Sequence, residues 1–347
     1  MEYRKLGNTN IDVSLICLGS MTWGEQNTQN EAFEQMDYAI DQGVNFFDTA
    51  ELYAIPPCAE TYGKTEEIIG NWFVSRGQRK KIILTSKVVG PGEDWLPHIR
   101  KGTSRLDRKT IESALNDSLK RLQTDYIDLY QLHWPDRKTN FFGHLGYNHE
   151  ADDNPIPIEE TLEALNDMVK AGKVRNIGLS NETPWGVMEF LKVSENKNWP
   201  RIVSVQNPYS LLNRSFEVGL AEIAVREQTG LLAYSPLGFG VLSGKYLNHQ
   251  KPHGARISKW PDYDRYINAQ AISATEQYVN LAQTHNLDPA QMALAYINSR
   301  PFLTSNIIGA TTMQQLKSNI ASVDLTLSDE VLDGIETIHV QHPNPSP

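Results

Sequence analysis

One pattern repeats along most of this chain: a short apolar stretch with strand character, followed by an amphipathic helix. The eight predicted strands span residues 16–19, 44–48, 81–87, 126–133, 174–180, 202–206, 231–235 and 306–309. These strands are too apolar to leave one face in water, which is typical of parallel sheets covered on both sides. Eight such units predict a closed (β/α)8 barrel of the α/β class. An open doubly wound sheet is the competing topology, but no Gly-x-Gly-x-x-Gly follows the first strand.

The segments outside this pattern are expected to decorate a single domain, residues 1–347. Residues 2–6 and 11–15, joined by a polar turn that starts at Gly7, predict an N-terminal β-hairpin covering one end of the fold. The connections after strands two, three, four and seven are unusually long, and loops of such length are generally functional or mobile. Further helices are predicted near residues 269–284 and 290–299, and a last C-terminal helix near 329–339.

Charge and cysteine content narrow the classes of partner. A net charge of −10 argues against nucleic acid or an anionic membrane surface as a partner. No apolar run approaches the roughly 20 residues that span a bilayer, and the first residues lack the apolar core of a secretory signal. Cys17 and Cys58 form no disulfide framework, and neither belongs to a metal-ligand cluster. We therefore expect a protein of the reducing cytoplasm without a metal site; its oligomeric state is left open.

Polar residues interrupt several predicted strands at their carboxyl ends. Asp48 ends the second strand, Lys87 the third and His133 the fourth, while Tyr53 lies in the loop after Asp48. Each alone is explained as a cap, a snorkelling lysine or a rim histidine, but barrel closure would bring all of these ends to one face. A phenol with a pKa near ~10 is a weak acid at neutral pH, and a neighbouring ammonium lowers that pKa. The set suits proton delivery to a carbonyl that receives a hydride, with the carboxylate holding the ammonium and the imidazole orienting the oxygen.

Four stretches, residues 47–53, 106–122, 125–135 and 172–181, resemble in sequence and order those of the aldo-keto reductase superfamily. The resemblance extends over about residues 1–340 and is closest to the bacterial Tas-type reductases, with a more distant similarity to the β subunits of voltage-gated potassium channels. It implies an NADP(H)-dependent TIM barrel and a catalytic tetrad of Asp48, Tyr53, Lys87 and His133, with Tyr53 as the general acid.

The resemblance also implies which positions contact the cofactor. Ser180, Asn181 and Gln206 would contact the nicotinamide carboxamide, and Tyr234 would stack on the ring. Ser235, Pro236, Leu237, Gly238, Gly244 and Lys245 would follow the pyrophosphate, and Gly309, Thr311, Gln315 and Asn319 would hold the adenosine phosphate. Arg256 would supply local positive charge, and Thr22 is a further implied cofactor residue.

Several of these assignments have a simpler competing explanation. Gln315 follows Thr312 with the spacing of a capping box, so its side chain is equally well explained as a helix cap. Gly238 and Gly244 are also ordinary loop residues. Trp23 and Trp134 are candidates to line the substrate pocket, although each is nearly as well explained as a packed aromatic at the barrel rim.

The chain departs from the family pattern directly after the tyrosine. Family members commonly have glycine there, whereas Ala54 follows Tyr53 and the Tyr-Gly pair appears only at Tyr62 and Gly63. Tyr53 keeps the family's distance from Asp48, and Tyr62 keeps the distance to the next helix. We favour Tyr53 because the strand end positions it most directly near Lys87.

These observations predict an NADPH-dependent oxidoreductase that reduces small aldehyde or ketone carbonyls to alcohols. The alternative is a regulatory nicotinamide-binding module with little turnover, as resemblance to channel subunits would allow. A barrel isomerase or hydrolase that uses no nicotinamide is the least favoured interpretation.

Overall fold

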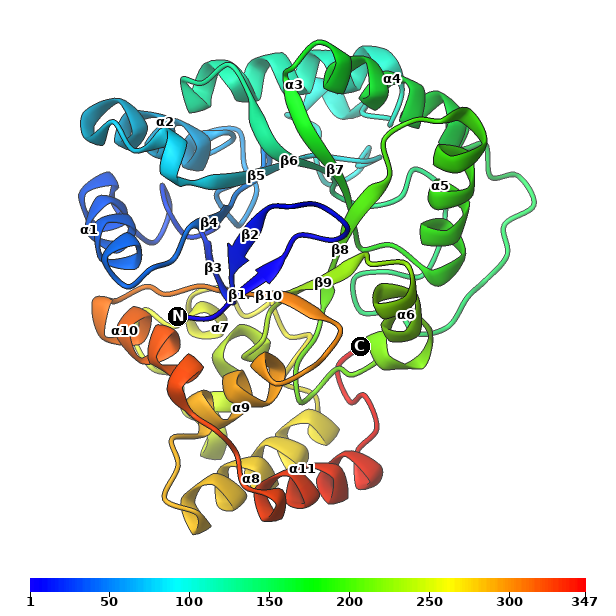
Figure 1. The fold of residues 1–347 in the computed structure, drawn as a ribbon. Coiled ribbons are helices and arrows are strands. Elements are labelled where there is room, and N and C mark those ends of the chain that lie inside the picture. The colour runs from blue at the N-terminus through cyan, green and yellow to red at the C-terminus, as the bar shows by residue number, and fades with distance from the viewer.

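The computed structural model describes residues 1–347, and eight parallel strands close into a barrel (Figure 1). Neighbouring strands follow one another in chain order, and the last strand closes the barrel by pairing with the first. The barrel strands are β3 (Ile16–Gly19), β4 (Phe46–Asp48), β5 (Ile83–Val88), β6 (Ile127–Leu132), β7 (Val174–Ser180), β8 (Ile202–Pro208), β9 (Gly230–Tyr234) and β10 (Leu303–Ile308). The predicted (β/α)8 barrel is therefore confirmed.

The helices form an outer layer around the barrel. They are α1 (Gln29–Asp41), α2 (Lys64–Arg76), α3 (Arg108–Leu122), α4 (Ile158–Lys170), α5 (Pro184–Lys197), α6 (Phe216–Arg226), α7 (Arg256–Lys259), α8 (Ala269–Thr284), α9 (Pro289–Asn298), α10 (Met313–Ala321) and α11 (Asp329–Gln341). Local sequence explains their ends: the Asp107 side chain caps α3 by accepting from the Thr110 N–H, and Gly172 takes a left-handed conformation just after α4. The extra helices α8 and α11 pack side by side (Figure 1).

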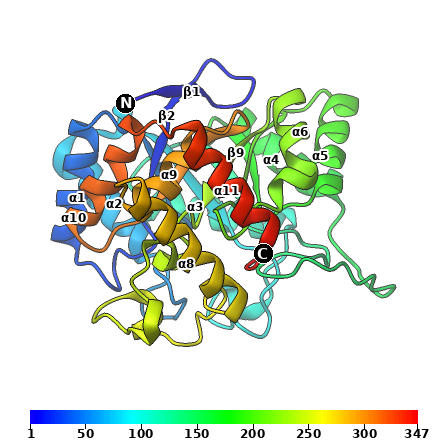
Figure 2. The same ribbon diagram turned by 90° about the horizontal axis from the view of Figure 1, so that it is seen from below.

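The N-terminal hairpin covers the amino-terminal end of the barrel (Figure 2). Strands β1 (Tyr3–Lys5) and β2 (Asp12–Ser14) pair antiparallel, and Leu6 and Val13 pack on side chains from inside the barrel, such as Phe46. Gly7 approaches the barrel so closely that a Cβ there would lie 2.3 Å from the Val203 carbonyl oxygen. This end is therefore filled, and the opposite end is left for the site.

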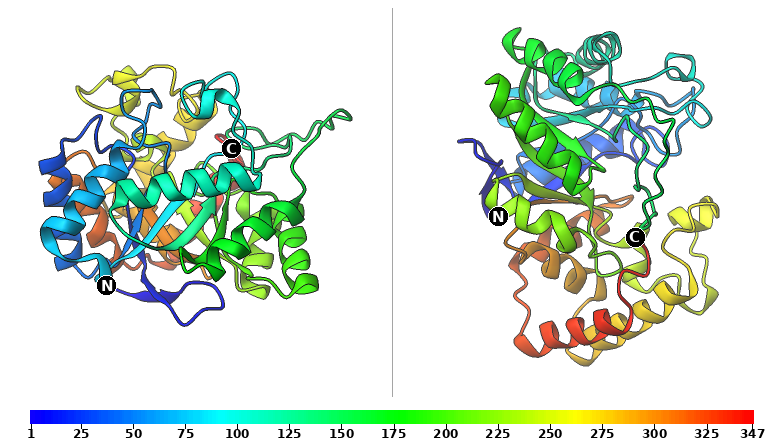
Figure 3. Two further views of the ribbon diagram at one scale, coloured as in Figure 1. Left: turned by 90° about the horizontal axis from the view of Figure 1, so that it is seen from above. Right: turned by 90° about the vertical axis from the view of Figure 1, so that its right-hand side faces the viewer.

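The long loops gather at the carboxyl ends of the strands (Figure 3, left). The strand register places the candidate residues there: Asp48 pairs with Gly19 and Thr85, and Lys87, two residues beyond Thr85, pairs with Gln131. The loop over residues 133–157 projects beyond the barrel at this end. No helix has both the length and the apolar character that crossing a bilayer would require.

Candidate active site

Four predicted side chains meet at the carboxyl end of the barrel. The Lys87 Nζ lies 2.8 Å from the Asp48 Oδ2, 2.8 Å from the Thr49 carbonyl oxygen and 3.3 Å from the Tyr53 hydroxyl. The His133 ring lies edge-on to the Tyr53 ring, with 5.8 Å between the centroids. Lys87 is fully buried, and the other three expose less than a tenth of their surface. The register of adjacent strands produces this cluster, because each side chain sits at or just beyond a strand end.

The environment shifts three of these pKa values. Burial raises the pKa of the Tyr53 phenol, and although the Lys87 ammonium opposes it, the net shift is upward. The ammonium therefore lowers the pKa as the sequence led us to expect, but burial outweighs this effect. Burial alone would lower the pKa of Lys87, but Asp48 and Tyr53 outweigh it and the net shift is upward. Burial and Lys87 together hold the pKa of His133 well below 6.5, so this imidazole is neutral at neutral pH.

The two candidate tyrosines occupy different electrostatic surroundings. Tyr53 contacts the Lys87 ammonium, whereas the Tyr62 hydroxyl donates to the Glu51 Oε2 at 2.9 Å. The Tyr62 ring lies 5.2 Å from the Arg121 guanidinium, away from the tetrad. The structure thus brings Tyr53, and not Tyr62, to the other three residues.

The residues expected around the nicotinamide are hydrogen-bonded to the same cluster. The Gln206 amide donates to the Asp48 Oδ1 at 2.8 Å. The Asn181 amide donates to the His133 carbonyl oxygen at 2.8 Å, and the Tyr234 hydroxyl donates to the Asn181 Oδ1 at 2.6 Å. The Ser180 hydroxyl donates to the Gln206 carbonyl oxygen. All of these residues therefore belong to one hydrogen-bonded network with the tetrad.

Two residues at this surface adopt uncommon backbone conformations. Asn181 and Ser235 have φ values of 53° and 52°, in the left-handed region that non-glycine residues seldom occupy. Such strain tends to occur at functional sites. Thr22, also predicted to contact the cofactor, is buried and its hydroxyl has no hydrogen-bond partner, as is true of the His133 Nδ1. Buried polar atoms without partners are uncommon and fit a surface that receives a polar ligand.

Lys245 and Arg256 are partly buried cations without a carboxylate partner. The Arg256 guanidinium lies 4.8 Å from the Phe239 ring centroid and forms no ion pair or hydrogen bond, and the Lys245 Nζ lies 5.2 Å from the Tyr246 ring centroid. Burial lowers the pKa of Arg256, and burial together with Arg256 lowers that of Lys245. In a chain with a net charge of −10, two adjacent cations left unpaired fit an anionic ligand.

The last group of predicted cofactor residues lies at the start of α10. The Gln315 Oε1 accepts from the Thr311 N–H and hydroxyl, and the Thr312 hydroxyl accepts from the Gln315 N–H, so both side chains cap the helix. The Asn319 amide donates to the Gly309 carbonyl oxygen, and a Cβ at the exposed Gly309 would meet no atom within 4 Å. Pro236, Leu237, Gly238 and Gly244 follow β9, and both glycines have positive φ. These caps occupy the Thr311 and Gln315 N–H groups, whereas the open space at Gly309 leaves room for an anion just before the helix.

The two predicted substrate tryptophans behave differently. Trp23 is fully buried and its indole N–H donates to the Gln35 Oε1 at 2.9 Å in α1, which favours the packed-aromatic explanation, while its place in the substrate pocket stays a prediction. It is a packed core residue because its ring turns inward toward the helical layer. Trp134 is adjacent to the tetrad, with its ring 5.0 Å from His133, and its N–H donates to the Pro91 carbonyl oxygen.

Aromatic rings continue outward from Trp134. Trp95 lies 5.1 Å and Phe142 5.7 Å from the Trp134 ring, and both reach the surface, 46% and 39% exposed. Of these two, Trp95 was not singled out from the sequence. A continuous aromatic wall therefore runs from His133 to solvent.

Another residue without a role in the sequence argument is Glu51. Its carboxylate is fully buried and pairs with Arg100 of the loop after β5 at 2.7 Å. Only its place within residues 47–53 could have pointed to Glu51 from the sequence. Its partner Arg100 lies in a loop, where no periodic pattern predicts contacts.

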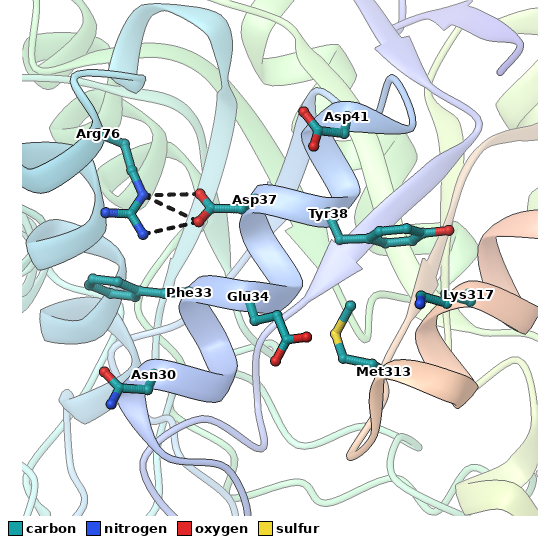
Figure 4. A pocket seen from close by; sticks show the side chains of 9 residues that line it. All are labelled: Asn30, Phe33, Glu34, Asp37, Tyr38, Asp41, Arg76, Met313 and Lys317. Atoms are coloured by element: carbon teal, nitrogen blue, oxygen red, sulfur yellow. Dashed lines mark hydrogen bonds and ion pairs between the residues drawn. The ribbon is translucent and has the colours of Figure 1, made fainter.

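A surface groove of a different character lies away from these residues. It encloses about 510 Å³ on the outer face of α1, α2 and α10 (Figure 4). Its carboxylates are Glu34, Asp37 and Asp41, and Arg76 pairs with Asp37. No predicted site residue lines it, and its acidic character does not suit a phosphate-bearing ligand.

Comparisons with known proteins agree with this geometry. Residues 15–339 match the model of the aldo/keto reductase family. The chain is 51% identical to "Protein tas" of Escherichia coli (strain K12), with 100% of both chains covered. It is 36% identical to the "Uncharacterized oxidoreductase YrpG" of Bacillus subtilis, covering 96% of this chain and 94% of the relative. A "Probable voltage-gated potassium channel subunit beta" of Arabidopsis thaliana is 30% identical, with 97% and 96% covered.

The match to the family model spans nearly the whole barrel, and the relatives align along their full lengths. Such coverage, together with a (β/α)8 barrel, identifies the family without reference to any single motif. The chain belongs to the aldo/keto reductase family of oxidoreductases.

Proposed function

We propose that this protein is an NADPH-dependent reductase of small aldehydes and ketones, with Tyr53 as the general acid. The observation that carries the proposal is the contact between the Tyr53 hydroxyl and the Lys87 ammonium, 3.3 Å apart, with Asp48 behind the ammonium. A phenol beside a fixed cation can release its proton when negative charge develops on a neighbouring oxygen.

Each member of the tetrad has a distinct part in this chemistry. When bound, NADPH supplies the hydride that reduces the carbonyl carbon. Tyr53 gives its phenolic proton to the carbonyl oxygen, and Lys87 stabilises the phenolate that remains until it regains a proton from solvent. Asp48 keeps Lys87 charged and in place. His133 is neutral, so its ring N–H can donate a hydrogen bond to the carbonyl oxygen without competing for the proton.

The residues around the tetrad suit a nicotinamide cofactor. Ser180, Asn181 and Gln206 would hold the carboxamide, and Tyr234 would lie against the ring. We assign the phosphate groups to Lys245 and Arg256, which lack other anionic partners, and to the segment from Gly309 to the start of α10. The remaining residues proposed for the cofactor are Thr22, Ser235, Pro236, Leu237, Gly238, Gly244, Thr311, Gln315 and Asn319. Unpaired cations in an acidic protein favour NADPH over NADH, because the additional phosphate gives them a partner.

A reducing cytoplasm is the compartment we propose, since both cysteines are free and Cys17 is buried among apolar side chains. The substrate we propose is a small carbonyl compound; neither nucleic acid nor a membrane is a proposed partner.

The proposal is tested with purified protein, NADPH and a panel of aliphatic and aromatic aldehydes and ketones. We expect carbonyl-dependent oxidation of NADPH, followed at 340 nm. Binding of NADPH, detected by quenching of tryptophan fluorescence, without reduction of any carbonyl would overturn the proposal. That outcome would instead support a nicotinamide-binding regulatory module, the role suggested by 30% identity to a probable channel β subunit.

A further inference from the structure

The buried Glu51 carboxylate is held by donors from three separate segments. Its Oε1 accepts from the Val89 N–H at 2.9 Å and from an Arg100 nitrogen at 2.7 Å. Its Oε2 accepts from a second Arg100 nitrogen at 2.8 Å and from the Tyr62 hydroxyl at 2.9 Å. A buried carboxylate needs such partners, and the paired fork of an arginine fixes its direction as well as its charge.

The backbone of Glu51 makes two more connections. Its N–H donates to the Lys87 carbonyl oxygen, and its carbonyl oxygen accepts from the Gly63 N–H. Glu51 lies three residues after Asp48 and two before Tyr53. It therefore joins the segment that carries Tyr53 to the end of β5, to the loop after β5 and to the start of α2.

By contrast, Tyr53 itself is weakly held. Its side chain has one hydrogen-bond contact, with Lys87 at the long distance of 3.3 Å. The Ala54 N–H donates to the Thr61 carbonyl oxygen, so the chain after Tyr53 is anchored through the end of residues 54–61, the insertion that separates Tyr53 from Tyr62. The position of the phenol thus depends on how firmly this loop is tied down.

We propose that Glu51, Arg100 and Tyr62 are positioning residues that hold the Tyr53 phenol against Lys87. This inference rests on the proposed function for its effect on turnover. It also assigns a role to the insertion after Tyr53, because the insertion brings Tyr62 to Glu51, where the Tyr62 hydroxyl donates a hydrogen bond to the carboxylate.

The same arrangement recurs around the rim. Asp136, after β6, accepts from Arg105 of the loop after β5, with 3.0 Å between the Arg105 Nε and the Asp136 Oδ1. Glu182, after β7, pairs with Arg137 of the loop after β6. Three arginine–carboxylate pairs therefore link, in series, the four loops that follow β4, β5, β6 and β7. Loop positions that catalysis depends on gain precision from such supports.

The test compares Arg100→Met and Tyr62→Phe with the control Arg76→Met, which removes the same charge from an exposed pair with Asp37 on the helical layer. Misplacement of the phenol by a fraction of an ångström is expected to lower kcat by about 10- to 100-fold for Arg100→Met and a few-fold for Tyr62→Phe. The Kd for NADPH should stay within about twofold of the value for the unmodified protein in all three variants, because none of the three side chains touches the proposed cofactor residues. Arg76→Met should also keep the kcat of the unmodified protein.

A second measurement does not need turnover. In protein labelled with 13C at the tyrosine Cζ, the Tyr53 resonance is assigned by its loss in Tyr53→Phe. We expect that resonance to move in Arg100→Met and Tyr62→Phe and to stay in place in Arg76→Met. If Arg100→Met does not fold, Tyr62→Phe, which deletes a single oxygen atom, decides the question alone.

Two results would overturn the inference: an unmoved Tyr53 resonance in the variants that fold, or kcat values equal to that of the control. The measurement of the Tyr53 resonance remains valid even if the protein reduces no carbonyl. Failure of the proposed function and failure of the positioning role are therefore distinguishable.

Discussion

Replacement of Asp48 by Asn tests the electrostatic arrangement at the centre of the site. Asp48 accepts from Lys87 at one oxygen and from the Gln206 amide at the other. Asparagine has nearly the same shape but offers only one oxygen, so its NH2 must face another donor. Lys87 would remain fully buried without a compensating charge.

The expected loss of stability follows from that burial. Removing one partner of a buried ion pair costs about 3–5 kcal/mol. For a chain of 347 residues the unfolding entropy is roughly 0.7 kcal/mol/K, so the melting temperature should fall by about 4–7 °C. The double variant Asp48→Asn/Lys87→Met carries no unpaired charge and should recover to within about 2 kcal/mol of the unmodified protein, but it should not recover activity.

The pH dependence gives a sharper signature. In the unmodified protein the Lys87 pKa is raised, so its contribution to stability is fully present below 10.5 and is lost only as pH rises through the raised value. Without Asp48, burial dominates and depresses the Lys87 pKa. The folded variant then binds fewer protons than the unfolded chain just below pH 10.5, so its stability rises with pH in that window. The difference in free energy of unfolding between the unmodified protein and Asp48→Asn should therefore become smaller from neutral pH toward pH 10.

The assay is urea unfolding followed by tryptophan fluorescence at several pH values for the three proteins. The reasoning is refuted if Asp48→Asn matches the unmodified protein at neutral pH, or if Asp48→Asn/Lys87→Met is no more stable than Asp48→Asn. Either result would show that Asp48 does not compensate for the burial of Lys87.

Three further predictions concern function. Tyr53→Phe should lower carbonyl reduction by about 10²- to 10⁴-fold with little change in the Kd for NADPH, whereas Tyr62→Phe should cost less than about tenfold; the opposite order would transfer the general acid to Tyr62. Arg256→Met should raise the Kd for NADPH by about 10- to 100-fold and that for NADH by much less, and equal effects in fluorescence titrations would remove Arg256 from the adenosine phosphate. The rate of reduction should be flat between pH 6.5 and 10.0, because the His133 pKa lies below that window and the Tyr53 pKa above it; an inflection inside the window in the kcat/KM profile would contradict these shifts.

The parts of the molecule that depend on periodicity were predictable from sequence. Apolar strands and helical stripes repeat with fixed spacing, so the barrel follows from them and barrel closure brings the ends of β4, β5 and β6 together. Asp48, Lys87 and His133 could be found because each interrupts a strand at its end.

What could not be predicted depends on long-range packing. The Trp23 indole N–H is bound to Gln35 of α1, and sequence alone does not set the partner of a loop side chain. The net pKa of Tyr53 reflects the depth of burial, which is a property of the assembled fold. Glu51 and Arg100 are 49 residues apart, and no local signal reports that a loop brings them together.

The insertion after Tyr53 places two tyrosines in one loop. The charged side chain beside each tyrosine determines which role that tyrosine can have. Burial raises the pKa of both phenols, but Lys87 opposes the rise at Tyr53, whereas the Glu51 carboxylate adds to it at Tyr62. A phenolate beside an ammonium is stabilised, so the proton of Tyr53 can leave; a phenolate beside a carboxylate is destabilised, so the proton of Tyr62 stays and serves as a hydrogen-bond donor. The insertion can therefore add a second tyrosine without adding a second general acid. Tyr62 instead helps to position Tyr53, because the Glu51 carboxylate that suppresses ionisation of Tyr62 belongs to the segment that carries Tyr53.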